Sequence, residues 1–135
     1  MKISEHITFE EATTSPTALR LGIDNTPNNL QIANMERVAE MCFEPLRKWY
    51  GKPIKINSFF RCKELNKAVK GSLNSDHQYG NSIDLTAGSK EENKKLFDWC
   101  KANLQFDQLI NEYDYSWVHI SYKEIGNRNM TLIII

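Results

Sequence analysis

The chain has 135 residues, of which 41% are hydrophobic and 25% are charged, as is ordinary for a globular domain. This length predicts one domain over residues 1–135 with enough chain to bury a core, and we expect a monomer. Basic and acidic residues both number 17, so the formal net charge is zero and no basic excess exists to bind nucleic acid. No apolar run approaches the length of a membrane span.

Helices dominate the N-terminal half of the chain. We predict helices over residues 9–13, 27–50 and 63–69, and a strand over residues 54–58. The first helix opens on the capping box of Thr8 and Glu11 and ends before Ser15-Pro16. Thr26 is the expected cap of the long second helix, and Pro45 is expected to kink that helix.

Strands dominate the C-terminal half. Strands are predicted over residues 80–86, 106–112, 117–122 and 130–135, and a helix capped by Ser89 over residues 90–103. The second and third of these strands are expected to form a hairpin. Helices early in the chain and strands late are typical of an α+β fold, with an antiparallel sheet and flanking helices.

The three cysteines do not indicate a disulfide framework. Cys42, Cys62 and Cys100 are odd in number and widely spaced. None has the Cys-x-x-Cys spacing of a thiolate zinc site, so reduced thiols are expected. Cys42 lies in the pattern of the long helix and is predicted to be a small core residue.

Two segments carry residues that can bind a metal. His77 and Asp84 stand in the stretch Ser75 to Asp84, and His119 follows in Trp117-Val118-His119. Strand alternation sends the apolar neighbours of Asp84 and His119 to the core, so both side chains face the other way. Two histidines and one carboxylate form the ligand set of an open zinc site, which leaves a position for water. A lone histidine such as His6 is, by contrast, more often structural.

The pattern Ser-x-His-x-x-Gly-x-x-x-Asp followed by Trp-x-His resembles the zinc D-Ala-D-Ala carboxypeptidase and L-alanyl-D-glutamate endopeptidase family. The segment Ile3 to Ala12 looks like the opening of its short, phage-type members, and Arg20 to Asn25 and Phe106 to Ile110 look like further landmarks. The resemblance implies a fold of the Hedgehog/DD-peptidase type, Zn²⁺ as cofactor and peptidoglycan stem peptide as substrate.

A zinc hydrolase also needs a base for the proton of the attacking water. Many relatives place a carboxylate three residues before the last histidine, where this chain has Ser116. Glu112 is the candidate here, because a four-residue turn over 113–116 sets it opposite Trp117 and diagonal to His119. Asp114, within the turn, is the alternative base. Either carboxylate could instead be only a solvated charge of the hairpin, with no role in catalysis.

Arg61 and Ser75 are the candidate substrate-binding residues. The stretch Ser58 to Arg61 resembles a family turn whose arginine lies in the cleft and contacts the substrate, although Phe59 replaces the usual glycine. A guanidinium can hold a carboxylate or a developing oxyanion, which would also give Arg61 a catalytic role. The Ser75 hydroxyl can bond the substrate or orient a ligand. A plain surface arginine is the alternative.

The candidate metal ligands predict a zinc hydrolase, and the family resemblance implies a metallopeptidase that hydrolyses peptide bonds of bacterial cell-wall peptidoglycan. Its bond specificity, at the D-Ala end or within the stem, stays open. The alternatives are a module that binds zinc and wall peptide without cutting it, and a phage structural subunit in which any metal only ties loops together. The N-terminus has no apolar signal region, so we expect synthesis in the cytoplasm and delivery to the wall by phage lysis, as an endolysin, or by a virion.

Overall fold

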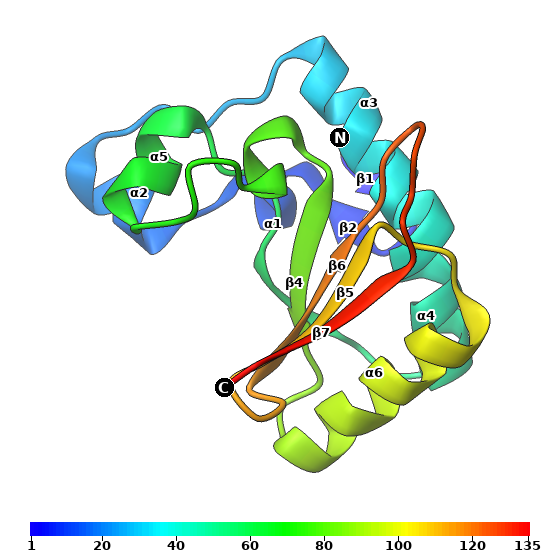
Figure 1. Ribbon diagram of the computed structural model, residues 1–135. Coiled ribbons are helices and arrows are strands. Elements are labelled where there is room, and N and C mark those ends of the chain that lie inside the picture. The colour runs from blue at the N-terminus through cyan, green and yellow to red at the C-terminus, as the bar shows by residue number, and fades with distance from the viewer.

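A five-stranded sheet forms the centre of the computed structural model, which describes all 135 residues (Figure 1). Its strands lie in the order β3-β4-β6-β5-β7. They span β3 Lys55–Ser58, β4 Ser82–Thr86, β5 Gln108–Glu112, β6 Trp117–Ser121 and β7 Met130–Ile134. A small second sheet pairs β1 (Lys2–Ser4) with β2 (Ile7–Thr8). Strands and helices in these proportions confirm the predicted α+β class.

Helices pack around the sheet. None of them is both long enough and apolar enough to cross a membrane. They are α1 Phe9–Thr13, α2 Pro16–Leu21, α3 Asn29–Val38, the π-helical η1 Ala39–Phe43, α4 Glu44–Tyr50, α5 Lys63–Ala68, the 3₁₀ turn η2 Asp76–Tyr79, and α6 Lys90–Asn103. In Figure 1, α3, α4 and α6 lie along one side of the sheet, while α2 and α5 lie together at the other end of the molecule.

The structure differs from the predicted helices of the N-terminal half in two places. Ser15-Pro16 ends α1 but also starts α2, because the Ser15 hydroxyl accepts the Ala18 N–H and proline suits a first helical turn. The long helix is capped by Asn28, whose side chain accepts the Gln31 N–H at 2.8 Å, and not by Thr26. The Thr26 hydroxyl instead donates to Asp24 at 2.6 Å.

Pro45 distorts the long helix as expected, by a wide turn. A proline removes one backbone donor and crowds the carbonyl four residues earlier. The preceding stretch η1 is π-helical, with the Glu44 N–H bonded to the Ala39 carbonyl, so the helix widens before the proline and then continues as α4. Cys42 is fully buried in this stretch, which confirms its place in the core.

The sheet is mixed, which corrects the purely antiparallel expectation. β7 runs parallel to β5, with Gln108 opposite Met130, whereas all other neighbours are antiparallel. β6 already has β4 on one side and β5 on the other, so the returning strand cannot pair with β6 and adds instead at the free edge of β5. A strand that follows β6 in the opposite direction is necessarily parallel to β5 there.

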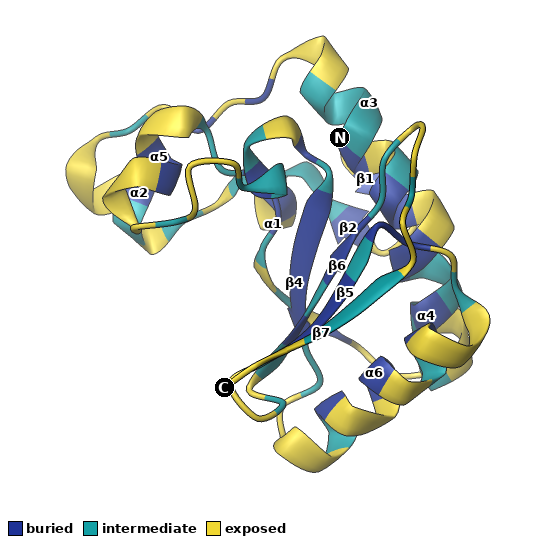
Figure 2. Cartoon of the chain, in the orientation of Figure 1, coloured by how far each residue is buried: buried dark blue, intermediate teal, exposed yellow.

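The two faces of the sheet differ in chemistry. Ile83, Leu85, Val118 and Ile120 point to the helical side and are fully buried in the main core. The alternate residues of β4 and β6 point to the other face and, except for Trp117, are polar. β4 is dark along most of its length in Figure 2, because four of its five residues are buried on one face or the other. A polar face over a packed core is a suitable floor for a site.

A buried aspartate fixes the connection between β6 and β7. Asp107 has no exposed surface and accepts from Arg128 Nε and Nη2, both at 2.9 Å, and from the Arg128 backbone N–H at 3.2 Å. Lys123 Nζ lies 3.4 Å from the same carboxylate. These hydrogen bonds, with Arg128 first, lower the pKa of Asp107 to about 2. The aspartate therefore holds residues 123–128 beside the start of β5.

Asp107→Asn is expected to lower the free energy of unfolding by roughly 3 kcal/mol, because it leaves charged partners unpaired around a buried group. The wild-type contribution is present above the ordinary aspartate pKa of about 4 and is lost as the pH falls toward 2. Urea unfolding at pH 7 and pH 3 measures both effects. Asp98→Asn is the control, since Asp98 makes an exposed pair with Lys94, and an equal loss in both variants would contradict the prediction.

Candidate active site

A cleft of about 330 Å³ opens on the polar face of the sheet. One wall is the segment 72–77 together with Arg61, and the floor is formed by β4, β6 and β5. All the candidate residues from the sequence except the alternative base Asp114 line it: Arg61, Ser75, His77, Asp84, Glu112, His119. The structure thus gathers into one cleft six side chains that come from both halves of the chain.

The backbone pairing of β4 and β6 places two of the candidate ligands. Asp84 lies directly opposite His119 in the antiparallel ladder. Their strand neighbours fill the core, so both side chains project to the cleft face, as the alternation predicted. Asp84 is 9% exposed, which is low for a carboxylate and requires partners.

The third candidate ligand, His77, comes from a loop whose shape depends on a glycine. His77 lies in η2, where its backbone N–H donates to the Ser75 hydroxyl at 3.2 Å. Gly80 ends this turn with a φ of +78°, a conformation that side chains disfavour. A Cβ there would also lie 2.6 Å from the Gln31 carbonyl of α3. Gly80 therefore lets the His77 loop pack closely on α3.

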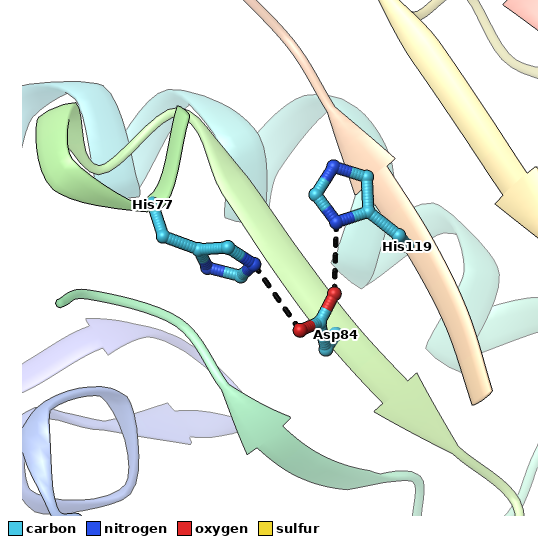
Figure 3. Close-up of side chains that lie close together, drawn as sticks. All are labelled: His77, Asp84 and His119. Atoms are coloured by element: carbon cyan, nitrogen blue, oxygen red, sulfur yellow. Dashed lines mark hydrogen bonds and ion pairs between the residues drawn. The ribbon is translucent and has the colours of Figure 1, made fainter. Parts of the chain in front are cut away.

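The three side chains converge, as Figure 3 shows, with the two rings on either side of the carboxylate. His77 Nε2 lies 3.1 Å from Asp84 Oδ2, and His119 Nδ1 lies 2.8 Å from Asp84 Oδ1. The potential ligand atoms all lie within 4.8 Å of one another. Convergence of this kind is what a shared metal requires, and the role of the three residues as ligands stays a prediction.

The hydrogen bonds of His77 favour a cation at this point. His77 Nδ1 lies 2.7 Å from the Phe59 carbonyl, which can only accept, so Nδ1 carries a proton. In the neutral ring Nε2 is then an acceptor that faces the acceptor Asp84 Oδ2. A proton or a metal ion between them satisfies both atoms. A second histidine and a carboxylate complete a donor set that fits zinc with an open position.

The electrostatics of the cluster point the same way. Burial opposes ionisation of Asp84, but His77 and His119 outweigh it and hold the pKa of that carboxyl well below its usual range. His77 is 2% exposed, so the charge of Asp84 lies in a poorly solvated pocket beside two ring nitrogens. A buried carboxylate that stays ionised is a strong ligand for a divalent cation.

Glu112 stands in the position that the hairpin register predicted. It pairs with Trp117, and Ile110 pairs with His119, so Glu112 is the diagonal neighbour of His119 on the cleft face. Burial raises the pKa of its carboxyl above the ordinary glutamate value. A raised pKa suits a group that takes up and releases a proton near neutral pH.

The alternative base lies outside the cleft. Asp114 is 80% exposed and pairs with Lys90 Nζ at 3.3 Å. Ser116, three residues before His119, donates its hydroxyl to the Tyr113 carbonyl within the turn. Neither side chain lines the cleft, so of the two candidate bases only Glu112 does.

Arg61 enters the cleft from the segment that follows β3. Its Nη2 donates to the Ser75 hydroxyl at 3.3 Å, and its Nε is buried without a partner. Burial lowers the pKa of the guanidinium and the charge of Asp84 opposes that effect, but arginine keeps its charge in proteins. No carboxylate pairs with Arg61, so the guanidinium charge and the N–H groups that do not bond Ser75 remain available to a ligand in the cleft.

Arg61→Lys is expected to lower peptide cleavage with little effect on the melting temperature. Lysine keeps the charge but loses the planar fork that grips a carboxylate or a carbonyl. We expect roughly a tenfold loss in kcat/KM, the size of one charged hydrogen bond. A surface role predicts no change in either quantity, and a joint fall of both would make Arg61 structural instead. Thermal unfolding and kinetics on one variant distinguish these results.

Other cleft residues were not predicted. Gln108 and Ile110 share the face of Glu112, so the alternation along β5 contains the signal that identifies them. Ile134 reaches the cleft only because β7 lies parallel beside β5, and no local pattern indicates that pairing. Cys62 caps α5 and lies outside the cleft, and all three cysteines are free thiols.

Comparison with known families identifies the chain. A search of curated proteins returns no match. A family model described as peptidase M15 matches residues 5–121, which is most of the chain and includes every candidate site residue. The chain therefore belongs to the peptidase M15 family, a family of metallopeptidases.

Proposed function

We propose that this protein is a zinc-dependent peptidase that hydrolyses peptide bonds in the stem peptides of bacterial peptidoglycan. The observation that carries the proposal is the convergence of His77, Asp84 and His119 beside Glu112 in one cleft. Membership of the M15 family supports the peptidase activity. Cleavage at the D-Ala end and cleavage within the stem are both compatible with this cleft.

His77 Nε2, Asp84 and His119 Nδ1 would hold the zinc ion. Zinc in an open site lowers the pKa of a water molecule and polarises a carbonyl. The remaining chemistry belongs to residues of this chain. The Glu112 carboxylate would accept a proton from the attacking water and pass it to the leaving amine. Its partly buried position beside His119 supports this transfer.

The walls of the cleft would orient the peptide. The free donors of Arg61 would hold a substrate carboxylate or the scissile carbonyl, and Ser75 would keep the guanidinium in place. Ile110, Trp117 and Ile134 supply an apolar side to the cleft, which removes water from around the reacting groups. Charged groups on one wall and apolar groups on the other suit a peptide bound along the sheet.

Incubation of the zinc-loaded protein with purified stem peptides, followed by mass spectrometry, tests the proposal and identifies the bond that is cut. We expect cleavage at one position. Binding without cleavage would favour a wall-peptide-binding module, and neither binding nor zinc uptake would favour a structural subunit. Delivery to the wall by phage lysis or by a virion is part of the same proposal. Release of wall fragments when the protein is added to cell walls from outside would support action on the intact polymer.

A further inference from the structure

A second groove lies on the other side of the segment that carries His77. It has a volume of about 720 Å³ and lies beside the first residues of α3 and α5. A volume of this size falls within the range of small-molecule sites. Asn74 lines both this groove and the catalytic cleft, so the two are neighbours across residues 72–79.

The groove is polar but almost uncharged, unlike the cleft. Lys63 is its one charged residue. Six of its ten lining residues carry neutral amide or hydroxyl groups: Thr26, Asn28, Gln31, Asn74, Gln78, Tyr79. Four of these side chains already make a hydrogen bond within the chain, whereas the Asn74 amide and the Tyr79 hydroxyl make none. An apolar ligand would leave these two groups unpaired, and an anionic ligand would meet a single cation. A ligand rich in hydroxyl and acetamido groups matches them, because amide side chains both donate and accept.

An exposed aromatic ring adds a flat apolar surface to the groove. Tyr79 is 54% exposed, and its hydroxyl makes no hydrogen bond within the chain. The ring of a sugar has apolar C–H faces as well as polar edges, so it can lie on an aromatic face while its edges bond to amides. This combination of ring and amides distinguishes a carbohydrate site from a peptide site.

The wall of the groove is held in place before any ligand binds. Gln31 Nε2 donates to the Gln78 carbonyl at 3.2 Å, and Asn34 Nδ2 donates to the Tyr79 carbonyl at 2.9 Å. The Asn74 side-chain amide makes no hydrogen bond within the chain and remains free. A preformed wall with free polar groups lowers the cost of ordering on binding.

We propose that this groove binds the glycan strand of the substrate, as N-acetylated sugar units, while the attached stem peptide lies in the cleft. The inference rests on the proposed function, because it takes peptidoglycan as the substrate. Sugar and peptide are covalently joined in that polymer, and groove and cleft are joined at Asn74. The His77 segment would thus lie between the two parts of one substrate.

The chain has a second exposed aromatic surface on which a sugar ring could lie. Trp49 on α4 stacks on Trp99 on α6, with ring centroids 5.2 Å apart, and Trp49 is 47% exposed. The stack already covers one face of each indole, and neither residue lines the cleft or the groove. This pair therefore provides a matched control for the loss of an exposed aromatic ring.

The experiment compares two substrates with the zinc-loaded enzyme: a stem peptide that carries its disaccharide and the same peptide without sugar. We expect a higher kcat/KM for the first substrate. Tyr79→Ala is expected to reduce the ratio of the two kcat/KM values by roughly tenfold, whereas Tyr79→Phe, which keeps the ring, retains most of it. Trp49→Ala should leave the ratio unchanged. Equal kcat/KM values in the wild type, or a loss of the ratio only in Trp49→Ala, would overturn the inference.

A binding measurement separates this inference from the proposed function. Peptide-free tetra-N-acetylchitotetraose is titrated into ¹⁵N-labelled wild-type protein. Shift changes at the amides of Gln31, Asn74 and Tyr79, absent in Tyr79→Ala, are expected even if neither peptide is cut. Lack of cleavage alone would reject the peptidase activity. Lack of any shift at these amides would reject the glycan site.

Discussion

Glu112→Gln is expected to lower turnover by roughly 10²–10⁴-fold while zinc remains bound. Glutamine keeps the size and the hairpin position of the side chain but cannot accept a proton. Steady-state kinetics on stem peptide and metal analysis of the same sample measure the two properties together. Because Glu112 is beside His119 and not within the three-residue cluster, zinc content should equal that of the wild type.

Asp114→Asn is the matched control for this result. It removes a carboxylate two residues further along the chain, on the exposed side of the turn. The turnover of Asp114→Asn should equal that of the wild type. A fall in Asp114→Asn with no fall in Glu112→Gln would assign proton transfer to Asp114. Loss of zinc in Glu112→Gln would make Glu112 a ligand and not a base.

Removal of the metal is expected to abolish cleavage, and addition of zinc should restore it. His119→Ala removes one of three ligands, so we expect substoichiometric zinc and a loss of activity of at least 10²-fold. Bound metal should also stabilise the fold, by about 3 kcal/mol at a free zinc concentration 100 times Kd. Thermal unfolding with and without zinc therefore reports binding independently of activity.

His6→Ala tests whether zinc binds in the cleft or elsewhere. Glu5, His6 and Glu44 form a second group of potential ligands, in which His6 Nδ1 lies 2.6 Å from a Glu44 carboxylate oxygen. That group is largely exposed, and its histidine already has an acidic partner. His6→Ala should keep one zinc per chain and full activity. Loss of zinc in this variant alone would move the metal site to the N-terminal hairpin.

Local sequence patterns were sufficient to predict the orientation of most site residues. Apolar alternation in residues 83–85 and 118–120 set Asp84 and His119 on the face opposite the core, as the structure confirms. The four residues of the 113–116 turn set the pairing of Glu112 with Trp117. Each of these predictions depends on neighbours within a few positions, which is the range over which strand periodicity and turn length act.

Predictions failed where several local signals competed or where no local signal exists. Thr26 and Asn28 are both good caps, and Asn28 forms the cap because Gln31 completes its capping box while Thr26 bonds Asp24. The parallel pairing of β7 depends on which edge of the sheet is free. That edge is known only after the order of β4, β6 and β5 is established.

The sequence by itself thus determined most of the elements, the faces they bury and the residue types of a candidate zinc site. Only the tertiary structure decided the relations between distant segments. It showed that the Phe59 carbonyl sets the proton of His77, that Ser75 holds Arg61, and that a neutral groove adjoins the cleft at Asn74. Periodicity specifies which face of an element is buried but not what packs against it. Segment 71–80 has no apolar periodicity, so its path depends on its packing against α3 and on the conformation of Gly80.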